Sequence, residues 1–319
     1  MEIRAPITSL QNSYVKFLRS LKHRKYRERE GRFFVEGIRI VEEAVTCGAD
    51  LERLVFCSGL LKNERAQKLI ENFAQRGGRC LSVAAPIFQK LSERDDPQGI
   101  GAVIRPINLT LEDLPVGAHT LLVVLDELQD PGNLGATIRT ADAAGAAGVV
   151  VLGTSADLYD PKTVRSTMGS LFSLPVVRLM DKEVFIGWVR RRGIRIIVSS
   201  VHGEHLYFNE DYRGDIALLV GNEARGVDPL LRARADATVR IPMAGRADSL
   251  NAASAAAVLV YEVVRQRIWD CQKQNKNRPL GQRPSRAGGR GAGSDPEGSP
   301  SRLEPPGRRL PRREDAEGF

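Results

Sequence analysis

Short, continuous apolar runs recur through the second half of the chain, and they constrain its fold more than any other feature. The runs occupy residues 120–125, 148–152, 194–199, 216–220 and 237–241, with helix-like stretches between them. A strand without polar–apolar alternation must be covered on both faces, as the strands of parallel sheets are. Because such strands alternate with helices here, the pattern predicts an α/β domain with a mostly parallel sheet over residues 120–271.

The first third of the chain carries a second α/β pattern. It opens with an apolar stripe at helical spacing, from Leu10 to Leu21, whose other face is basic. Strand-like segments follow at 33–35, 54–57, 80–84 and 99–105, with helical patterns between them. We therefore predict a separate α/β domain over residues 1–105 and a linker over residues 106–119, which contain two prolines and a glycine.

Charge and composition distinguish both ends of the chain from its middle. The net charge is +8, and residues 1–30 and 272–319 each contribute +5, so the middle is slightly acidic. From residue 272 onward Gly and Pro are frequent while Val, Ile, Tyr and Trp are missing, which predicts a disordered tail. Basic ends favour a polyanionic ligand, because phosphate contacts release counterions, although short basic stretches also serve solubility alone.

Several classes of protein are excluded by the sequence. No run approaches the roughly 20 apolar residues of a membrane span, and the N-terminus lacks the apolar segment of a secretory signal. We therefore expect a cytoplasmic protein with reduced cysteines, since its four cysteines form no CxxC pair. No GxGxxG follows a strand, which argues against an ordinary dinucleotide site. His202 and His205 have no third ligand nearby in sequence, so no metal is expected.

Three of the apolar runs end in unusual polar turns, at the edge of a parallel sheet where ligands bind. The first reads DPGNLGATIRTADAAG and places Asn133 near a helix start, where it fits a helix cap or a ligand contact, and Arg139 outside that helix's apolar stripe. The second, LVGNEARGV, puts Gly221 and the carboxylate of Glu223 at a strand end. The third, IPMAGRADSLNAASAAAV, leads through Ser249 and Asn251 into an alanine-rich helix.

Each turn alone also has a purely structural explanation. Arg139 fits a solvated helix charge, Glu223 fits a surface ion pair with Arg225, and Ser249 or Asn251 fits a helix cap. Three such turns in one domain favour a ligand site at the carboxyl ends of the strands.

In this order and at these separations, the three stretches resemble the motifs of the SpoU/TrmH RNA ribose 2′-O-methyltransferases of the SPOUT superfamily. Residues 1–105, with Phe34-Val35-Glu36-Gly37 before a helix, are similar to the L30e-like substrate-binding domain of members that modify rRNA. The resemblance implies a trefoil knot at the C-terminal end of the sheet and S-adenosylmethionine as cofactor. It also implies a homodimer whose active site forms between two subunits.

Carried over by position, the resemblance implies two groups of site residues. The polar catalytic group is Asn133, Arg139, Glu223, Ser249 and Asn251. The group that holds S-adenosylmethionine is Gly221, Asn222, Ile241, Met243 and Leu250. The resemblance implies that Arg139 lies near the reacting hydroxyl. Its guanidinium is better suited to clamping a phosphate and stabilising an alkoxide than to acting as the literal base.

The predicted function is therefore methylation of a ribose 2′-hydroxyl in RNA, with 23S rRNA expected because of the additional N-terminal domain. The alternatives are a tRNA substrate, a non-catalytic RNA-binding or ribosome-assembly protein on the same fold, and an unrelated nucleotide-dependent enzyme. In the first domain, RNA contacts are expected from the basic residues Lys22, Arg24, Lys25 and Arg27.

Overall fold

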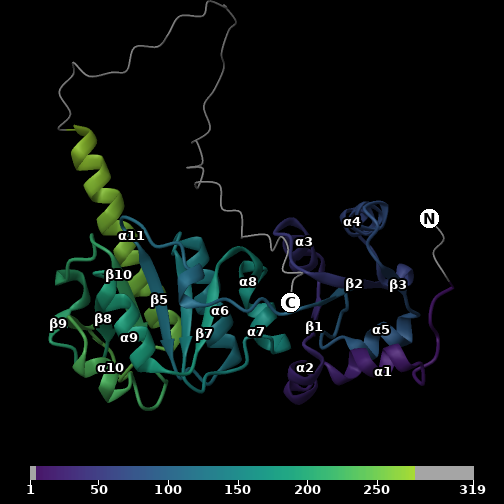
Figure 1. The fold of residues 1–319 in the computed structure, drawn as a ribbon, viewed down its shortest axis with the longest axis horizontal. Helices are drawn as coiled ribbons and strands as arrows, with labels where there is room; N and C mark the ends of the chain where they lie inside the picture. The colour runs from purple at the N-terminus through teal and green to yellow at the C-terminus, as the bar shows by residue number, and fades with distance from the viewer. Residues whose placement is uncertain (1–4, 277–319) are drawn as a thin grey trace, which may run out of the picture.

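The computed structural model describes residues 5–276, which form two α/β units side by side (Figure 1). The first unit contains a four-stranded sheet in the order β1-β4-β2-β3, and the second a seven-stranded sheet in the order β7-β6-β5-β10-β8-β11-β9. Over the described residues, no helix is both long enough and apolar enough to cross a membrane. The tail predicted from residue 272 lies, from residue 277 on, outside the described residues.

The first unit is a mixed sheet with helices on both faces. Its strands are β1 (Phe33–Glu36), β2 (Leu51–Phe56), β3 (Cys80–Ser82) and β4 (Ile100–Ile104). Its helices are α1 (Ser13–Ser20), α2 (Arg24–Glu30), α3 (Ile38–Thr46), α4 (Glu64–Gln75) and α5 (Ala85–Leu91). Strand β4 is antiparallel to both of its neighbours, whereas β2 and β3 are parallel. Apolar side chains of α3 and α4 pack on one face, and those of α1 and α5 pack on the other.

The second unit is a wholly parallel sheet, as every pair of neighbouring strands shows. Its strands are β5 (Leu121–Asp126), β6 (Gly148–Leu152), β7 (Val176–Leu179), β8 (Arg195–Ser199), β9 (His205–Leu206), β10 (Ile216–Val220) and β11 (Ala237–Arg240). Its helices are α6 (Pro131–Ala143), α7 (Pro161–Thr167), α8 (Ser170–Ser173), α9 (Lys182–Arg191), α10 (Pro229–Ala233) and α11 (Ala252–Lys276).

Strand β5 shows why the continuous apolar runs predict this architecture. All of its residues are buried, and successive side chains enter different hydrophobic clusters. Leu121, Val123 and Leu125 face the side covered by α6 and α11, while Leu122 and Val124 face α9 and α10. Since alternate residues of a strand point to opposite faces, both faces of a central strand must be apolar when helices cover both.

The structure differs from the sequence expectations at three places. Strands β7 and β9 were not expected, because β9 has two residues and β7 lies at a sheet edge with Arg178 exposed. Helix α6 is capped by Asp130 rather than by Asn133, which lies inside the first turn. Helix α11 continues to Lys276, beyond the predicted domain boundary at residue 271, because Gln and Lys favour helix and no Gly or Pro interrupts them.

Two chain segments cross at the carboxyl end of β11. This strand lies between β8 and β9, so the segment joining β8 to β9 must pass over it. Gly203 lies at the crossing, where an added Cβ would be 2.3 Å from the carbonyl carbon of Val239. Only a residue without a side chain allows so close an approach.

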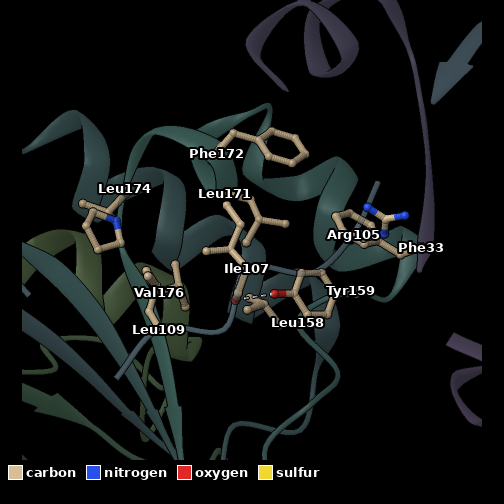
Figure 2. Close-up of a pocket in the computed structure, with 11 residues that line it drawn as sticks. Phe33, Arg105, Ile107, Leu109, Leu158, Tyr159, Leu171, Phe172, Leu174 and Val176 are labelled. Carbon is tan, nitrogen blue, oxygen red and sulfur yellow. Dashed lines mark hydrogen bonds between the residues drawn. The ribbon is translucent and has the colours of Figure 1, made fainter. Parts of the chain in front are cut away.

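The two units share one hydrophobic core. A single cluster of buried residues includes Phe33 and Val41 of the first unit and Ile138 of the second. The Phe33 ring lies 4.5 Å from that of Tyr159, centroid to centroid, and Figure 2 shows both at a small cavity of the junction. The predicted linker is packed as well, because Leu111 and Leu114 are buried against the second sheet.

Candidate active site

Three polar turns of the second unit meet at the carboxyl ends of its strands. The Asn133 side chain, in the first turn of α6, donates from Nδ2 to Oε1 of Glu223 at 2.9 Å. Asn251, directly before α11, donates from Nδ2 to Oδ1 of Asn133 at 2.8 Å. A continuous chain Asn251–Asn133–Glu223 therefore joins segments that lie 90 and 118 residues apart in sequence.

The start of α6 holds Asn133 in place. Asp130 accepts a hydrogen bond from the backbone N–H of Asn133 at 2.8 Å, and its other carboxylate oxygen binds Lys162 Nζ at 2.8 Å. The Lys162 ammonium, together with this cap bond, lowers the pKa of Asp130 below its usual value. An ionised carboxylate at a helix N-terminus also interacts favourably with the helix dipole.

Glu223 is held as a charged hydrogen-bond acceptor. Its partial burial opposes ionisation, but hydrogen bonds from the Asn133 side chain and from nearby backbone N–H groups, including that of Gln129, outweigh it and lower the pKa of Glu223. The alternative ion pair with Arg225 does not form, because Arg225 Nη2 binds Glu127 Oε2 at 2.8 Å instead. Glu223 thus remains available to a ligand.

Asn222 shapes the loop that carries Glu223. Its Oδ1 accepts from the N–H groups of Ala224 and Arg225, and its Nδ2 donates to the carbonyl of Glu127 at 2.9 Å. Its backbone N–H and carbonyl are both paired with Gly226. Gly221, which precedes it, packs directly against the backbone of Gly226. Since all polar groups of Asn222 are engaged within the protein, its expected part in cofactor binding would be to build the loop.

The third turn presents apolar and polar groups together. Ile241 and Met243 are half-buried, and Leu250 is exposed beside the exposed hydroxyl of Ser249. Asn251 Oδ1 accepts from the N–H groups of Ala253 and Ser254, so of the two candidates Ser249 and Asn251 it is Asn251 that caps α11. Asn251 therefore caps α11 through Oδ1 and binds Asn133 through Nδ2.

Arg139 lies on α6 but away from this chain of hydrogen bonds. It is exposed and stands six residues after Asn133. At 3.6 residues per turn, the two side chains point about 120° apart around the helix and lie about 9 Å apart along it. One subunit therefore does not bring Arg139 to the side of α6 on which Asn133 meets Glu223.

The basic residues expected to bind RNA occupy different positions. Arg24 and Lys25 of α2 are exposed, and Lys22 is half-buried with its Nζ donating to the carbonyl of Ser92. Arg27 is only 5% exposed and pairs with Asp157 of the second unit. A direct RNA contact by Arg27 does not fit this position, because the guanidinium is already covered and paired.

A further cluster of charges was not expected from the sequence. Lys182 Nζ lies 2.8 Å from Asp126, 3.0 Å from Glu127 and 2.8 Å from Asp228. Burial opposes protonation of Lys182, but its three carboxylate partners outweigh this effect and raise its pKa. Asp126 ends β5 and Asp228 caps α10. The sequence carries no signal for Lys182, because the strand that precedes it, β7, was not expected. The only signal for a charged site here was the acidic pair Asp126-Glu127 at the end of an apolar run.

Comparisons with known proteins identify the family of this chain. Residues 120–261 match the SpoU rRNA Methylase family, and residues 12–102 match the MRM3-like substrate binding domain. The chain is 37% identical to a 23S rRNA (uridine(2479)-2′-O)-methyltransferase of Streptomyces viridochromogenes, over 82% of this chain and 92% of the relative. The chain belongs to the SpoU family of rRNA methylases.

Two further proteins are similar to this chain, one in sequence and one in structure. The 23S rRNA (guanosine(2553)-2′-O)-methyltransferase RlmP of Bacillus subtilis is 35% identical over 81% of this chain and 98% of its own length. The crystal structure of AviRb from Streptomyces viridochromogenes in complex with AdoMet superposes with a TM-score of 0.75 at 37% identity, covering 81% of this chain and 99% of AviRb. The predicted family membership is thereby confirmed.

Proposed function

We propose that this SpoU-family enzyme transfers a methyl group from S-adenosylmethionine to a ribose 2′-hydroxyl of RNA, with 23S rRNA as the substrate. The observation that carries the proposal is the Asn251–Asn133–Glu223 chain, which assembles one polar site from the three motif turns. The relatives that act on 23S rRNA support the choice of substrate.

The residues around this chain suit S-adenosylmethionine. The cofactor is amphiphilic, with an adenine ring, a sulfonium and a charged amino-acid end. Ile241, Met243 and Leu250 offer partly exposed apolar surface at the sheet edge, directly beside the polar Ser249. We infer that these side chains and the Gly221 loop would hold the cofactor, which when bound supplies an electrophilic methyl group.

The protein's own groups position the nucleophile. Asn133 uses its oxygen toward Asn251 and its amide toward Glu223, so its orientation is determined at both ends. The low pKa of Glu223 makes it a good acceptor for the ribose hydroxyl but a weak base. Glu223 therefore orients and polarises the hydroxyl, whose proton passes to water at the exposed edge of the site. Orientation of this kind supplies much of the rate enhancement in such reactions.

A second subunit would complete the site. Arg139 is directed away from Asn133, yet a phosphate clamp must lie beside the ribose that reacts. The exposed Tyr261 and Ile268 on α11 leave apolar surface uncovered in one chain. We propose a homodimer in which Arg139 of one subunit faces the Glu223 of the other. Light scattering coupled to gel filtration should give twice the chain mass, and a monomeric mass would contradict the proposal.

We also propose that the crossing at Gly203 is part of a trefoil knot. The segment from β8 to β9 passes over β11, and the chain after β11 returns to the sheet face covered by α6 and α11. Such threading is an exception to the usual rule for connections, and it would hold the Gly221 and Ser249 loops against each other.

The decisive experiment is transfer of radiolabelled methyl from S-adenosylmethionine to total RNA, followed by digestion and nucleoside mapping. We expect label in one 2′-O-methylated nucleoside of 23S rRNA and none with Arg139→Ala. Label in tRNA would retain the reaction and reject the substrate. Tight cofactor binding without label would favour an RNA-binding or ribosome-assembly protein, and calorimetry without cofactor binding would favour an unrelated enzyme.

A further inference from the structure

Arg27 faces the second unit although it belongs to the basic helix of the first. Its Nη1 donates to the carbonyls of Leu21 and Lys22 at 2.9 and 2.7 Å. Its Nη2 and Nε both donate to Oδ2 of Asp157, at 2.6 and 3.2 Å, and Asp160 lies 3.8 Å away. One buried guanidinium thus ties the end of α1 and the start of α2 to the second unit.

The acidic residues that pair with Arg27 are connected to the active site through helices α7 and α6. Asp160 caps α7, and α7 packs closely on α6. A Cβ at Gly135 of α6 would lie 2.4 Å from the carbonyl oxygen of Thr163, so little rearrangement is possible between the two helices. Since α6 carries Asn133, a chain of tight contacts runs from Arg27 to the catalytic hydrogen bonds.

Contacts of Tyr159 also hold the two units together beside the Arg27–Asp157 pair. The Tyr159 ring packs against that of Phe33 in a tilted arrangement, and its hydroxyl donates to the carbonyl of Ile107 at 3.1 Å (Figure 2). Burial raises the pKa of Tyr159 to about 12, so the hydroxyl keeps the proton that it donates. Figure 1 shows α7 and α8 on the side of the second unit nearest the first, where α7 contacts β1 and α8 contacts α3.

We propose that Arg27 is a positioning residue, which determines the spacing between the RNA-facing side of α2 and the active site. Arg24 and Lys25 are exposed on this helix, while Arg27 anchors it through Asp157. RNA held by α2 would then present one particular ribose to Glu223. This inference rests on the proposed function, and it assigns to Arg27 the choice of the nucleotide rather than the binding of RNA.

Two substitutions with opposite charge distinguish this role from a direct RNA contact. Arg27→Met removes a positive charge, and Asp157→Asn removes the negative charge that it meets. A phosphate contact predicts opposite effects on RNA affinity, because binding depends on the sum of nearby charges. A positioning role predicts that both variants lower kcat/KM for 23S rRNA by roughly 10-fold to 100-fold and spread methylation to neighbouring nucleotides.

The controls use residues of the same helix. Arg29→Met removes the same charge from a side chain that is 62% exposed, and it should keep the single methylated nucleotide. Arg27→Lys keeps the charge but cannot reach the same four acceptor contacts, so it should resemble Arg27→Met. In all variants the Kd for S-adenosylmethionine should stay within about twofold, since the cofactor loops are not touched.

Small-angle X-ray scattering without RNA gives a second readout, independent of activity. We expect a larger radius of gyration for Arg27→Met and Asp157→Asn than for wild type and Arg29→Met. Asp157→Asn retains an oxygen that can accept from Arg27 and is therefore the milder change. It tests the same contact if Arg27→Met does not fold.

The proposal is overturned if Arg27→Met and Arg29→Met weaken RNA binding equally while methylation stays at one nucleotide, or if Asp157→Asn increases activity. If wild type methylates no RNA, the proposed function fails. An unchanged radius of gyration would then reject the junction role separately.

Discussion

At neutral pH the Glu223 carboxylate is ionised, and Asn133 depends on that charge for its orientation. Glu223→Gln keeps an oxygen that can accept from Asn133 but removes the charge. We expect the single-turnover rate of methyl transfer to fall about 100-fold or more, with little change in melting temperature. Glu183→Gln removes an exposed carboxylate of α9 and should leave the rate unchanged. A rate for Glu223→Gln close to wild type would contradict an orienting role.

The same residue predicts the direction of a pH effect. Because the folded pKa of Glu223 lies below its ordinary value of 4.5, the ionised form stabilises the native state. This contribution is present above the unfolded pKa and is lost as the pH falls through the folded pKa. Glu223→Gln should therefore flatten the acid side of the stability profile.

Lys182 is the only cation described within 4 Å of all three carboxylates Asp126, Glu127 and Asp228. Its side chain is 11% exposed and that of Asp126 is 2% exposed, so Lys182→Met leaves like charges in a poorly solvated place. Because Glu127 and Asp228 keep 26% and 33% of their side-chain exposure, we expect a loss of about 1–3 kcal/mol, the cost of leaving a buried charged group without its partner, and urea denaturation measures it.

A control on the same helix makes the Lys182 prediction specific. Arg191→Met on the same helix, where the side chain is exposed, should have a small effect on stability. Equal losses in the two variants would mean that the cluster does not stabilise the fold.

At the scale of helices and strands, substitutions of Asn251 can separate its cap of α11 from its hydrogen bond to Asn133. Asn251→Asp keeps the oxygen that caps α11 but replaces the amide that donates to Asn133. We expect near wild-type stability and a large loss of methyl transfer. Asn251→Ala should in addition lose about 1 kcal/mol of stability. Asp181→Ala, which removes the cap of α9, should lose stability without the catalytic defect.

The crossing of two segments at β11 makes a different prediction. Gly203→Ala would place a methyl group 2.3 Å from the Val239 backbone, and backbone cannot move aside as a flexible side chain can. We expect a loss of at least 1–3 kcal/mol, measured by chemical denaturation. Gly214→Ala, where an added Cβ meets nothing within 4 Å, is the matched control and should be nearly neutral.

For the whole molecule, the shared core predicts that the two units unfold together. Phe33 is 1% exposed and contacts rings of the second unit. Calorimetry should therefore show one transition for wild type, with equal calorimetric and van't Hoff enthalpies. Phe33→Ala opens the junction and should separate the transition into two. Two transitions in wild type would show that the units are thermodynamically independent.

Much of the second unit is predictable because it depends on local periodicity. Continuous burial of β5 requires a continuous apolar run, and an alanine-rich helix after Asn251 requires a cap. The resemblance to the SpoU family by itself assigns Asn133, Glu223 and Asn251 to one polar site. Hydrogen bonds join these three side chains, whereas the exposed Arg139 lies on another side of α6 within one chain.

The sequence by itself determined most of the strands of both sheets and the motifs of the SpoU family. The tertiary structure alone decided which groups are paired. Arg27 reads as one of four basic residues until Asp157, 130 residues later, is seen to bind it. Lys182 is likewise one lysine of a surface helix until three distant carboxylates surround it. Local patterns record which face of an element is buried, but an ion pair depends on how distant segments pack, and no periodicity encodes that.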